Sequence, residues 1–589
     1  MKKRILCLLL VLAMMLGISG MLASCGGNED DDFGGKRDDD EFTDDEKGVS
    51  KYYEYTWSTK TLNVELSEHT CASELVSRVK RYLAGKDTNY NDPLDDDIRY
   101  RNGRATTVCR TDINYTYLPD ITAYEWGANI SRMASDSQSY SDTSADIYVN
   151  FMYDTVSASL QGAFANLRST TMYKSEGKNY FEFVYDENYD ATVDDEGYMY
   201  DLMNSLSFST RKMYVLASDY LTDVVRAFFI VPVNIAMLEG IDVTMVEQYN
   251  ADGNDEFTVD DFYESIIWDY QWNYDAIKVL SAAVHDQLGE NVNVKEDIHG
   301  FILDGYASGL MGSGLLYGSG ISIISRTLNK ETGFYDVTYP TSAGAYGDFC
   351  DAVTSLFSST GVYGLKGYVE GGKNGEPDYN LRTNTPAMLI EQLFANDQVL
   401  FGGIICAGNL ERPAYQEMLA SEEKGHGVAV APVPMYRTFD AALDVDAKGV
   451  NRYYRTASHN IAKVAAISVA TTKFKECTAW LDYQSTHSTD ILNYYYDQEL
   501  QYAIAGGDRH TVKVLQELRK NVSTALDKIY DDAVCTQINQ KGQRFCELYW
   551  RGGFQPKEIR TKYTAAIQIK EDFLKQLQKK FEDDQLLAP

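Results

Sequence analysis

Basic residues are scarce in this chain of 589 residues, which carries 54 Lys and Arg against 87 Asp and Glu. The resulting net charge of −33 excludes most nucleic-acid binding, because a positive field is needed to meet phosphate. Proline is also scarce, at 11 residues, while 44% of the residues are hydrophobic. This balance excludes a largely disordered or polyproline-rich chain and indicates a globular protein.

Motifs for chemistry are also missing. None of the seven histidines lies in HExxH, no serine has GxSxG spacing, and no CxxC pair is present. Six glycines between Gly305 and Gly320 complete no nucleotide-binding loop, and indicate a flexible or closely packed backbone. A carboxylate dyad follows no spacing rule, so a hidden one is left open. The sequence predicts no enzyme, no cofactor and no metal site.

The N-terminus predicts export and lipid anchoring. Three basic residues precede an apolar run over 5–22, and Leu22-Ala-Ser-Cys25 follows directly. This is the pattern of a secretory signal, and the tetrad resembles the lipobox of bacterial lipoproteins. The resemblance implies that the signal 1–24 is cleaved and that Cys25 is acylated. An uncleaved membrane anchor is the alternative for a run of this length, but the tetrad argues against it.

Cleavage would remove three positive charges and change the net charge from −33 to −36. Such a chain is repelled by anionic lipid, so only the lipid on Cys25 would hold it outside the cytoplasm, on the bacterial cell membrane. Residues 26–48 are rich in Gly and Asp and cannot fold alone. They predict a flexible acidic tether over 25–49, with calcium binding as the alternative.

Hydrophobic patterns beyond residue 50 predict an α/β fold. We expect strands over 61–66, 108–117, 146–150, 212–216, 227–231, 427–432 and 461–470. We expect helices over 73–83, 121–133, 157–167, 274–284 and 474–483, and mostly helix from about 511. Asn273 is the expected N-cap of 274–284, residues 86–107 are expected to be polar and turn-rich, and 174–200 an acidic insertion.

Five blocks, in this order, resemble an extracellular solute-binding lipoprotein of an ABC transporter, family 1, carbohydrate type. They are the lipobox with its tether; Lys212-Met-Tyr with Val233-Asn234; Phe257-Thr-Val-Asp-Asp-Phe262 with Gln271-Trp-Asn-Tyr-Asp275; Val399-Leu-Phe-Gly-Gly403 with 427–436; and 461–470 with 474–483. Two positions depart from the pattern of the family: Ile235 replaces the usual lysine, and Asn273 replaces the usual threonine.

The resemblance implies a periplasmic-binding-protein-like clamshell of type II, with two lobes joined by crossover hinges. Lobe one maps to 50–210 plus 462–530, and lobe two to 211–461 plus 531–589. The implied function is a monomeric receptor that captures a small-molecule solute, a mono- or oligosaccharide, in an interlobe cleft for an ABC transporter permease. The alternatives are a SusD-like glycan-capture lipoprotein, which predicts an almost all-helical fold, and a surface-anchored carbohydrate hydrolase.

Candidate ligand contacts follow from the rule that parallel sheets bind ligands at the carboxyl ends of their strands. The 44 tyrosines suit saccharides, whose rings have apolar faces and a polar rim. The candidates are Asn150 and Tyr153 after strand 146–150, Tyr306 and Tyr317 beside the glycines, Trp480, and Trp550 in a YWRGG turn. A loop cap is the alternative for the first pair and core packing for the other four; Trp272 is assigned to structure. The net charge disfavours anionic ligands, although a local pocket can override it.

Overall fold

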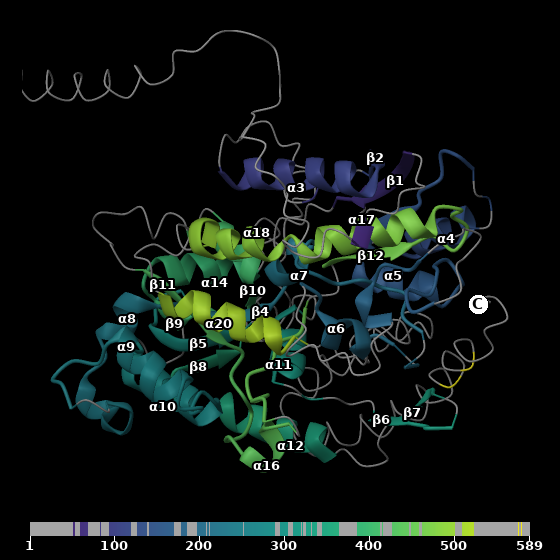
Figure 1. The fold of residues 1–589 in the computed structure, drawn as a ribbon. Helices are drawn as coiled ribbons and strands as arrows, with labels where there is room; N and C mark the ends of the chain where they lie inside the picture. Colours follow the sequence, from purple (N-terminus) through teal and green to yellow (C-terminus); the bar gives the residue numbers. More distant parts are fainter. Residues whose placement is uncertain are drawn as a thin grey trace, which may run out of the picture. The chain divides into compact units, whose positions relative to one another are not determined.

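The computed structural model describes residues 51–522 with gaps, together with Lys575 and Lys579. The longer gaps cover 53–58, 69–82, 84–92, 119–125, 170–177, 185–196, 289–294, 304–309, 339–343, 365–385, 416–426 and 501–508. The chain divides into two units, Met1–Glu54 and Tyr55–Pro589, and every helix and strand named below belongs to the second (Figure 1). The predicted signal, Cys25 and the whole tether lie outside the described residues, as do most of the helix predicted over 73–83 and most of the 174–200 segment.

The first sheet has four strands in the order β12–β3–β1–β2. They are β1 (Lys60–Ser67), β2 (Thr111–Leu118), β3 (Ile147–Phe151) and β12 (Lys463–Ile467). The first three run parallel, and β12 returns from far along the chain to pair antiparallel with β3. Every residue of β3 and β12 is buried, which matches their continuous apolar sequence. Helices α3 (Pro93–Cys109) and α17 (Phe474–Thr486) pack together beside this sheet, and α4 (Trp126–Asp136) packs on α5 (Met152–Ser159) (Figure 1).

The second sheet has six strands in the order β10–β4–β9–β5–β8, with β11 also paired to β4. They are β4 (Phe229–Asn234), β5 (His299–Leu303), β8 (Val362–Gly364), β9 (Val399–Phe401), β10 (Ile405–Cys406) and β11 (Val428–Pro432). Strand β5 runs parallel to β8 and β9, whereas β4 is antiparallel to β9, β10 and β11. Helix α10 (Tyr274–Val284) packs on β5, α14 (Pro386–Ala395) on β9 and α20 (Arg509–Lys520) on β11 (Figure 1).

Shorter elements join these layers. They are α6 (Tyr200–Ser205), α7 (Thr222–Arg226), α8 (Ile235–Glu239), α9 (Val259–Asp261), α11 (Leu310–Gly318), β6 (Ser325–Leu328), β7 (Tyr335–Thr338), α12 (Gly344–Leu356), α16 (Ala441–Asp444) and α18 (Thr489–Tyr494). Two π-helical segments (Phe262–Ile267 and Tyr495–Leu500) and four 3₁₀ turns (Glu182–Val184, Val243–Met245, Glu247–Tyr249 and Ala407–Glu411) complete the described elements.

The chain crosses between the two sheets twice, from β3 to β4 and from β11 back to β12. The two crossing segments are paired with each other by an antiparallel bridge at Phe228↔Ser458, and the first crossing segment also pairs with β12 at Leu216↔Ala465. Leu216 N donates to Ala465 O at 2.7 Å, and Ala465 N donates back to Leu216 O at 2.9 Å. The predicted α/β fold of two sheets joined by crossovers is confirmed. The boundaries of the two lobes stay a prediction.

Local signals at the start of α10 are confirmed. The Asn273 side chain accepts hydrogen bonds from Asp275 N and Ala276 N, as an N-cap does. Trp272 is fully buried, and its Nε1 donates to Pro432 O at 2.7 Å, in keeping with a structural role. Thr258 and Asp261 form a reciprocal capping box at the start of α9, in the third block of the resemblance to solute-binding proteins.

Three sequence predictions of local structure are wrong. Residues 86–107 are not all turn-rich, because α3 occupies Pro93–Cys109 and buries Leu94, Ile98 and Ala105. Pro93 at its first position and acidic residues in its first turn are ordinary helix-start signals, but the polar composition masks them. Residues 212–216 form isolated bridges rather than a strand, since they belong to a crossing segment. The helix expected over 157–167 lies earlier, at Met152–Ser159.

Candidate functional site

The two crossing segments meet each sheet at a defined edge. In the first sheet, Phe151 at the end of β3 pairs with Lys463 at the start of β12. In the second sheet, Pro432 at the end of β11 pairs with Ile230 near the start of β4. Strands β5, β8 and β9 also end at this edge, because they run opposite to β4. Ligands bind open α/β sheets beyond the carboxyl ends of parallel strands, so these two edges frame the candidate site.

Asn150 and Tyr153 lie together at the edge of the first sheet. Asn150 is in β3 and fully buried; its Oδ1 accepts from Asn129 Nδ2 at 3.0 Å and from Phe151 N at 2.8 Å. Tyr153 is in the first turn of α5 and 6% exposed. The hydrogen bonds of Asn150 suit the capping role that was the alternative for this residue. A contact of either side chain with a ligand stays a prediction.

Asp154 is a site residue that the sequence did not single out. It is fully buried, and its Oδ2 accepts a short hydrogen bond from Asn129 Nδ2. Its Oδ1 has no hydrogen-bond partner in the described part of the chain. Burial raises the pKa of Asp154 to about 7, although the Asn129 hydrogen bond and the charge of Arg132 oppose the rise. Among 87 acidic residues, one carboxylate after a buried strand carries no distinguishing signal.

Arg132 supports this edge from α4. Its guanidinium pairs with Glu65 at 2.6 Å and donates to Asn129 Oδ1 at 3.0 Å. It therefore holds the amide of Asn129 in the orientation that reaches both Asn150 and Asp154. The arrangement is a polar network at the carboxyl end of β3, built from β1, α4, β3 and α5.

The other predicted contacts are not brought together. Tyr317 lies in α11 and is buried. Trp480 lies in α17 with no exposed surface, and its ring packs edge-on against Tyr220 with centroids 5.6 Å apart. Protein covers both rings in this conformation, so their roles toward a ligand stay predictions. Tyr306 and Trp550 lie outside the described residues.

A pocket of about 100 Å³ opens beyond the end of β11. We call it the arginine pocket; it is lined by Ser319, Ile321, Ala345, Met435, Tyr436, Arg437 and Arg455. Its walls come from four separate parts of the sequence: the end of α11, the start of α12, the segment after β11, and the second crossing segment. The pocket therefore combines the edge of the second sheet with the chain that leads back to the first.

Close backbone packing positions the walls of the arginine pocket. A Cβ on Gly318 would lie 2.6 Å from Val433 Cγ2, so α11 reaches the segment after β11 only with glycine there. Hydrogen bonds then fix that segment: Met435 N donates to Trp272 O at 3.3 Å, and Tyr274 N donates to Met435 O at 3.0 Å. Of the two readings of the glycine-rich segment, close packing applies at this position.

The two arginines of the pocket differ in their partners. Arg437 forms a fork with the buried carboxylate of Asp444, at 2.6 and 2.7 Å, and this hydrogen bonding raises the pKa of Arg437. Arg455 donates from Nε to Arg452 O at 2.7 Å, and no carboxylate lies within ion-pair distance of it in the described part of the chain. Burial lowers the pKa of Arg455, Asp444 opposes this, and the charges of Arg437 and Arg452 add to the lowering.

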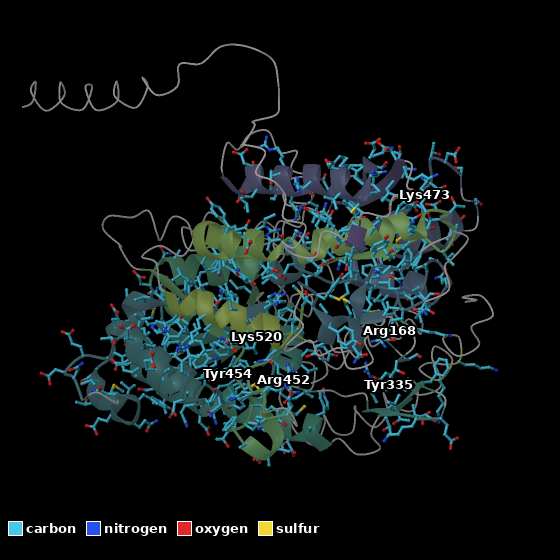
Figure 2. All side chains as sticks on the ribbon, viewed as in Figure 1. Arg168, Tyr335, Arg452, Tyr454, Lys473 and Lys520 are labelled. Atoms are coloured by element: carbon cyan, nitrogen blue, oxygen red, sulfur yellow. The ribbon has the colours of Figure 1, made fainter. Side chains whose placement is uncertain are left out.

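Arg452 precedes Arg455 by three residues, and its side chain has partners outside the arginine pocket. Arg452 and Lys520 lie side by side (Figure 2), and Arg452 Nη1 donates to Lys520 O at 2.9 Å. Arg452 also pairs with Asp446 at 3.1 Å and with Asp201 of α6 at 3.3 Å. Its charge is thus met by two carboxylates, which leaves Arg455 as the cation that faces the pocket without one among the described residues.

Among the residues that the structure describes, no group of His, Cys, Asp and Glu side chains could hold a metal ion. None of the helices in the described ranges is long and apolar enough to cross a membrane.

Solved structures of solute-binding proteins resemble this chain. One from Agrobacterium vitis, an ABC transporter protein with bound D-mannitol, is 12% identical, with 88% of this chain and 99% of that chain covered at a TM-score of 0.37. The galacto-N-biose/lacto-N-biose I-binding protein of Bifidobacterium longum is 11% identical, with 89% and 99% covered and a TM-score of 0.43. A probable secreted solute-binding lipoprotein of Streptomyces coelicolor is 11% identical, with 86% and 98% covered and a TM-score of 0.42.

No family model matches the chain, and no curated protein matches it. The TM-scores of the solved structures are below 0.5, so we base the proposals below on the chain's own topology and side chains.

Proposed function

We propose that this protein is a lipid-anchored receptor that captures a mono- or oligosaccharide between its two sheets and delivers it to an ABC transporter permease. The observation that carries this proposal is the pairing of the first crossing segment with the second at Phe228↔Ser458 and with β12 at Leu216↔Ala465. A paired double crossing between two α/β sheets is a natural hinge, because a few residues there can absorb a rotation of one sheet against the other. A solute closes such a hinge only if it binds the closed state more tightly.

The arginine pocket supports binding rather than catalysis. Its lining combines apolar Ile321 and Met435 with the hydroxyl of Tyr436 and two guanidinium groups. Apolar surface with a few polar groups is what a sugar ring requires. None of its lining residues is a carboxylate, whereas glycoside hydrolysis requires a pair of them. The pocket therefore gives the hydrolase alternative no support, and the two sheets contradict the nearly all-helical fold of the SusD-like alternative.

A thermal-shift screen tests the receptor function directly. The purified full chain is heated with mono- and oligosaccharides, and with peptides as a comparison set. Ligand at 100 times its Kd stabilises the native state by roughly 2.7 kcal/mol, so a bound saccharide raises the melting temperature. Recovery of the saccharide unchanged completes the expected result. Recovery of cleaved sugar would instead establish a hydrolase, and a shift with peptides alone would overturn the saccharide class.

Variants at the predicted contacts sharpen the same screen. We propose contacts from Asn150, Tyr153, Tyr306, Tyr317, Trp480 and Trp550. Tyr153→Ala, at the edge of the first sheet, should reduce the saccharide shift. Tyr100→Ala is the matched control, because Tyr100 is 61% exposed on α3 and takes no part in the candidate site. Equal shifts in both variants would remove Tyr153 from the site.

The lipid anchor has its own test. We propose that Cys25 is acylated and holds the mature chain at the outer surface of the cell membrane through the acidic tether. Two or more acyl chains give stable anchoring, so the full chain should sediment with membranes and take up a fatty-acid label. Cys25→Ala should lose the label. If the variant still takes up label, the modified residue is a different one.

A further inference from the structure

We infer that the captured saccharide is acidic, and that Arg455 binds its carboxylate in the arginine pocket. This inference rests on the proposed receptor function and specifies the class of its substrate. Of the two guanidinium groups that line the pocket, Arg437 is forked by Asp444 at 2.6 and 2.7 Å. Arg455 has only the carbonyl of Arg452 as its hydrogen-bond acceptor in the described part of the chain.

A half-buried guanidinium that has no carboxylate partner is energetically unfavourable. Arg455 is half-buried, and burying a charge is unfavourable unless a counter-charge or hydrogen bonds replace the lost water. The charges of Arg437 and Arg452 both lower the pKa of Arg455, although each of these two arginines has carboxylate partners of its own. A bound anion would supply the missing acceptor. The site is therefore built for a ligand that brings a negative charge with it.

The shape of the donors favours a carboxylate. The guanidinium of arginine is a planar fork that matches the two oxygens of a carboxylate. The Nε atom of Arg455 is already used within the chain, which leaves the two terminal nitrogens for the ligand. Tyr436 lies in the same lining, and its hydroxyl makes no hydrogen bond to any other described residue. It can bind a ring hydroxyl beside the carboxylate, as expected for a hexuronate residue.

The net charge of −33 does not prevent this binding. Charges on the protein surface are screened over about 8 Å at physiological ionic strength, so the repulsion from distant carboxylates is weak at the pocket. The carboxylate of Asp444, whose charge raises the pKa of Arg455, is already paired in its fork with Arg437. The local field of Arg455 therefore decides which charge the pocket accepts, against the expectation from composition.

Calorimetric titration of the full chain compares galacturonate oligomers with galactose oligomers of the same length, and with galactose 6-phosphate. We expect the galacturonate oligomers to bind more tightly than both. Arg455→Gln should weaken them about 10- to 100-fold, since hydrogen bonds to charged groups contribute about 1.5–3 kcal/mol. Arg455→Lys should weaken them less, because it keeps the charge and loses the fork. Arg99→Gln is the control for overall charge and should leave the affinity unchanged, because the Arg99 side chain is 46% exposed on α3 and takes no part in the pocket.

Each outcome separates the two proposals. If galactose oligomers bind as tightly as the acidic ones and Arg455→Gln has no effect, the acidic class is overturned. The proposed receptor function is then retained. Tighter binding of the phosphate would overturn the carboxylate assignment. An absence of binding by every saccharide would overturn the receptor function and this inference with it. The melting temperature of each variant without ligand shows whether Arg455→Gln is folded, and Arg455→Lys repeats the comparison if it is not.

Discussion

Burial sets the chemistry of single side chains at the candidate site. Burial raises the pKa of Asp154 and lowers the pKa of Arg455. In both residues it therefore favours the neutral form. Asp154 has an asparagine amide as its main partner, and Arg455 has a backbone carbonyl. Neither partner carries a full opposite charge. Both residues therefore keep an interaction capacity that the described residues do not satisfy.

Asp154 predicts a specific pH dependence of stability. Its native pKa of about 7 exceeds the ordinary value of 3.8, so the native state binds more protons than the unfolded state between these pH values. The free energy of unfolding should therefore fall as pH rises through this window. Asp154→Asn keeps the acceptor for Asn129 and removes the ionisation, so it should be more stable than the natural chain at pH 8 by about 1–3 kcal/mol.

Urea denaturation at pH 4.5 and pH 8 measures this effect. The difference between Asp154→Asn and the natural chain should be small at the lower pH and large at the higher one. Asp136→Asn is the control, because Asp136 is 41% exposed and pairs with the same Arg132. A difference for Asp154→Asn that is equal at both pH values would contradict a buried, proton-binding carboxyl.

At the scale of elements, sequence patterns worked for strands whose apolar residues are buried in an unbroken or regularly alternating run. Strands 61–66, 146–150 and 427–432 appear as β1, β3 and β11, and the cap at Asn273 appears as expected. The sequence did not predict helix α3, because charged and polar residues interrupt its buried positions. Asn150 and Tyr153 could be placed at a sheet edge because a strand end can be predicted locally. The arginine pocket could not, because only tertiary packing joins its four distant segments.

The glycines of helix α11 allow close packing against its neighbours, which leads to a prediction at the scale of elements. A Cβ on Gly314 would lie 2.4 Å from Ile404 Cγ2 and 3.0 Å from Phe229 Cδ1, both next to or within strands of the second sheet. Gly314→Ala should lower the free energy of unfolding by about 1–3 kcal/mol through overpacking. Gly103→Ala in α3 meets nothing within 4 Å, so it should instead stabilise the protein by about 0.5–1 kcal/mol.

Denaturant midpoints of the two alanine variants give the comparison. The same chemical change should have opposite signs in the two helices, which separates packing from helix propensity. Stabilisation by Gly314→Ala would mean that α11 moves away from the sheet at little cost and that its close approach is not required.

At the scale of the whole molecule, a buried charge network ties both sheets to the first crossing segment. Arg226 ends α7 and is 1% exposed; it pairs with Asp223 at 2.7 Å and with Glu411 at 2.9 Å. Glu411 follows β10 of the second sheet, and Tyr495 also donates to it at 2.8 Å. Lys463 begins β12 of the first sheet and lies 3.5 Å from Asp223. Two cations and two carboxylates thus balance where the chain passes between sheets.

Removing one member of this network should destabilise the whole unit. Arg226→Met takes a cation away from two buried carboxylates, and breaking a buried pair in this way costs about 3–5 kcal/mol. Arg226→Met combined with Glu411→Gln should recover much of the loss, because Asp223 still has Lys463 and the second buried carboxylate is gone. Lys520→Met, at the exposed pair with Glu517 on α20, should change little. Urea denaturation gives the free energy of unfolding of each of the three variants. If the double variant is no more stable than Arg226→Met, the Arg226 side chain acts by packing. The expected order, with the double variant between Arg226→Met and the natural chain, would show that charge balance is what the crossing requires.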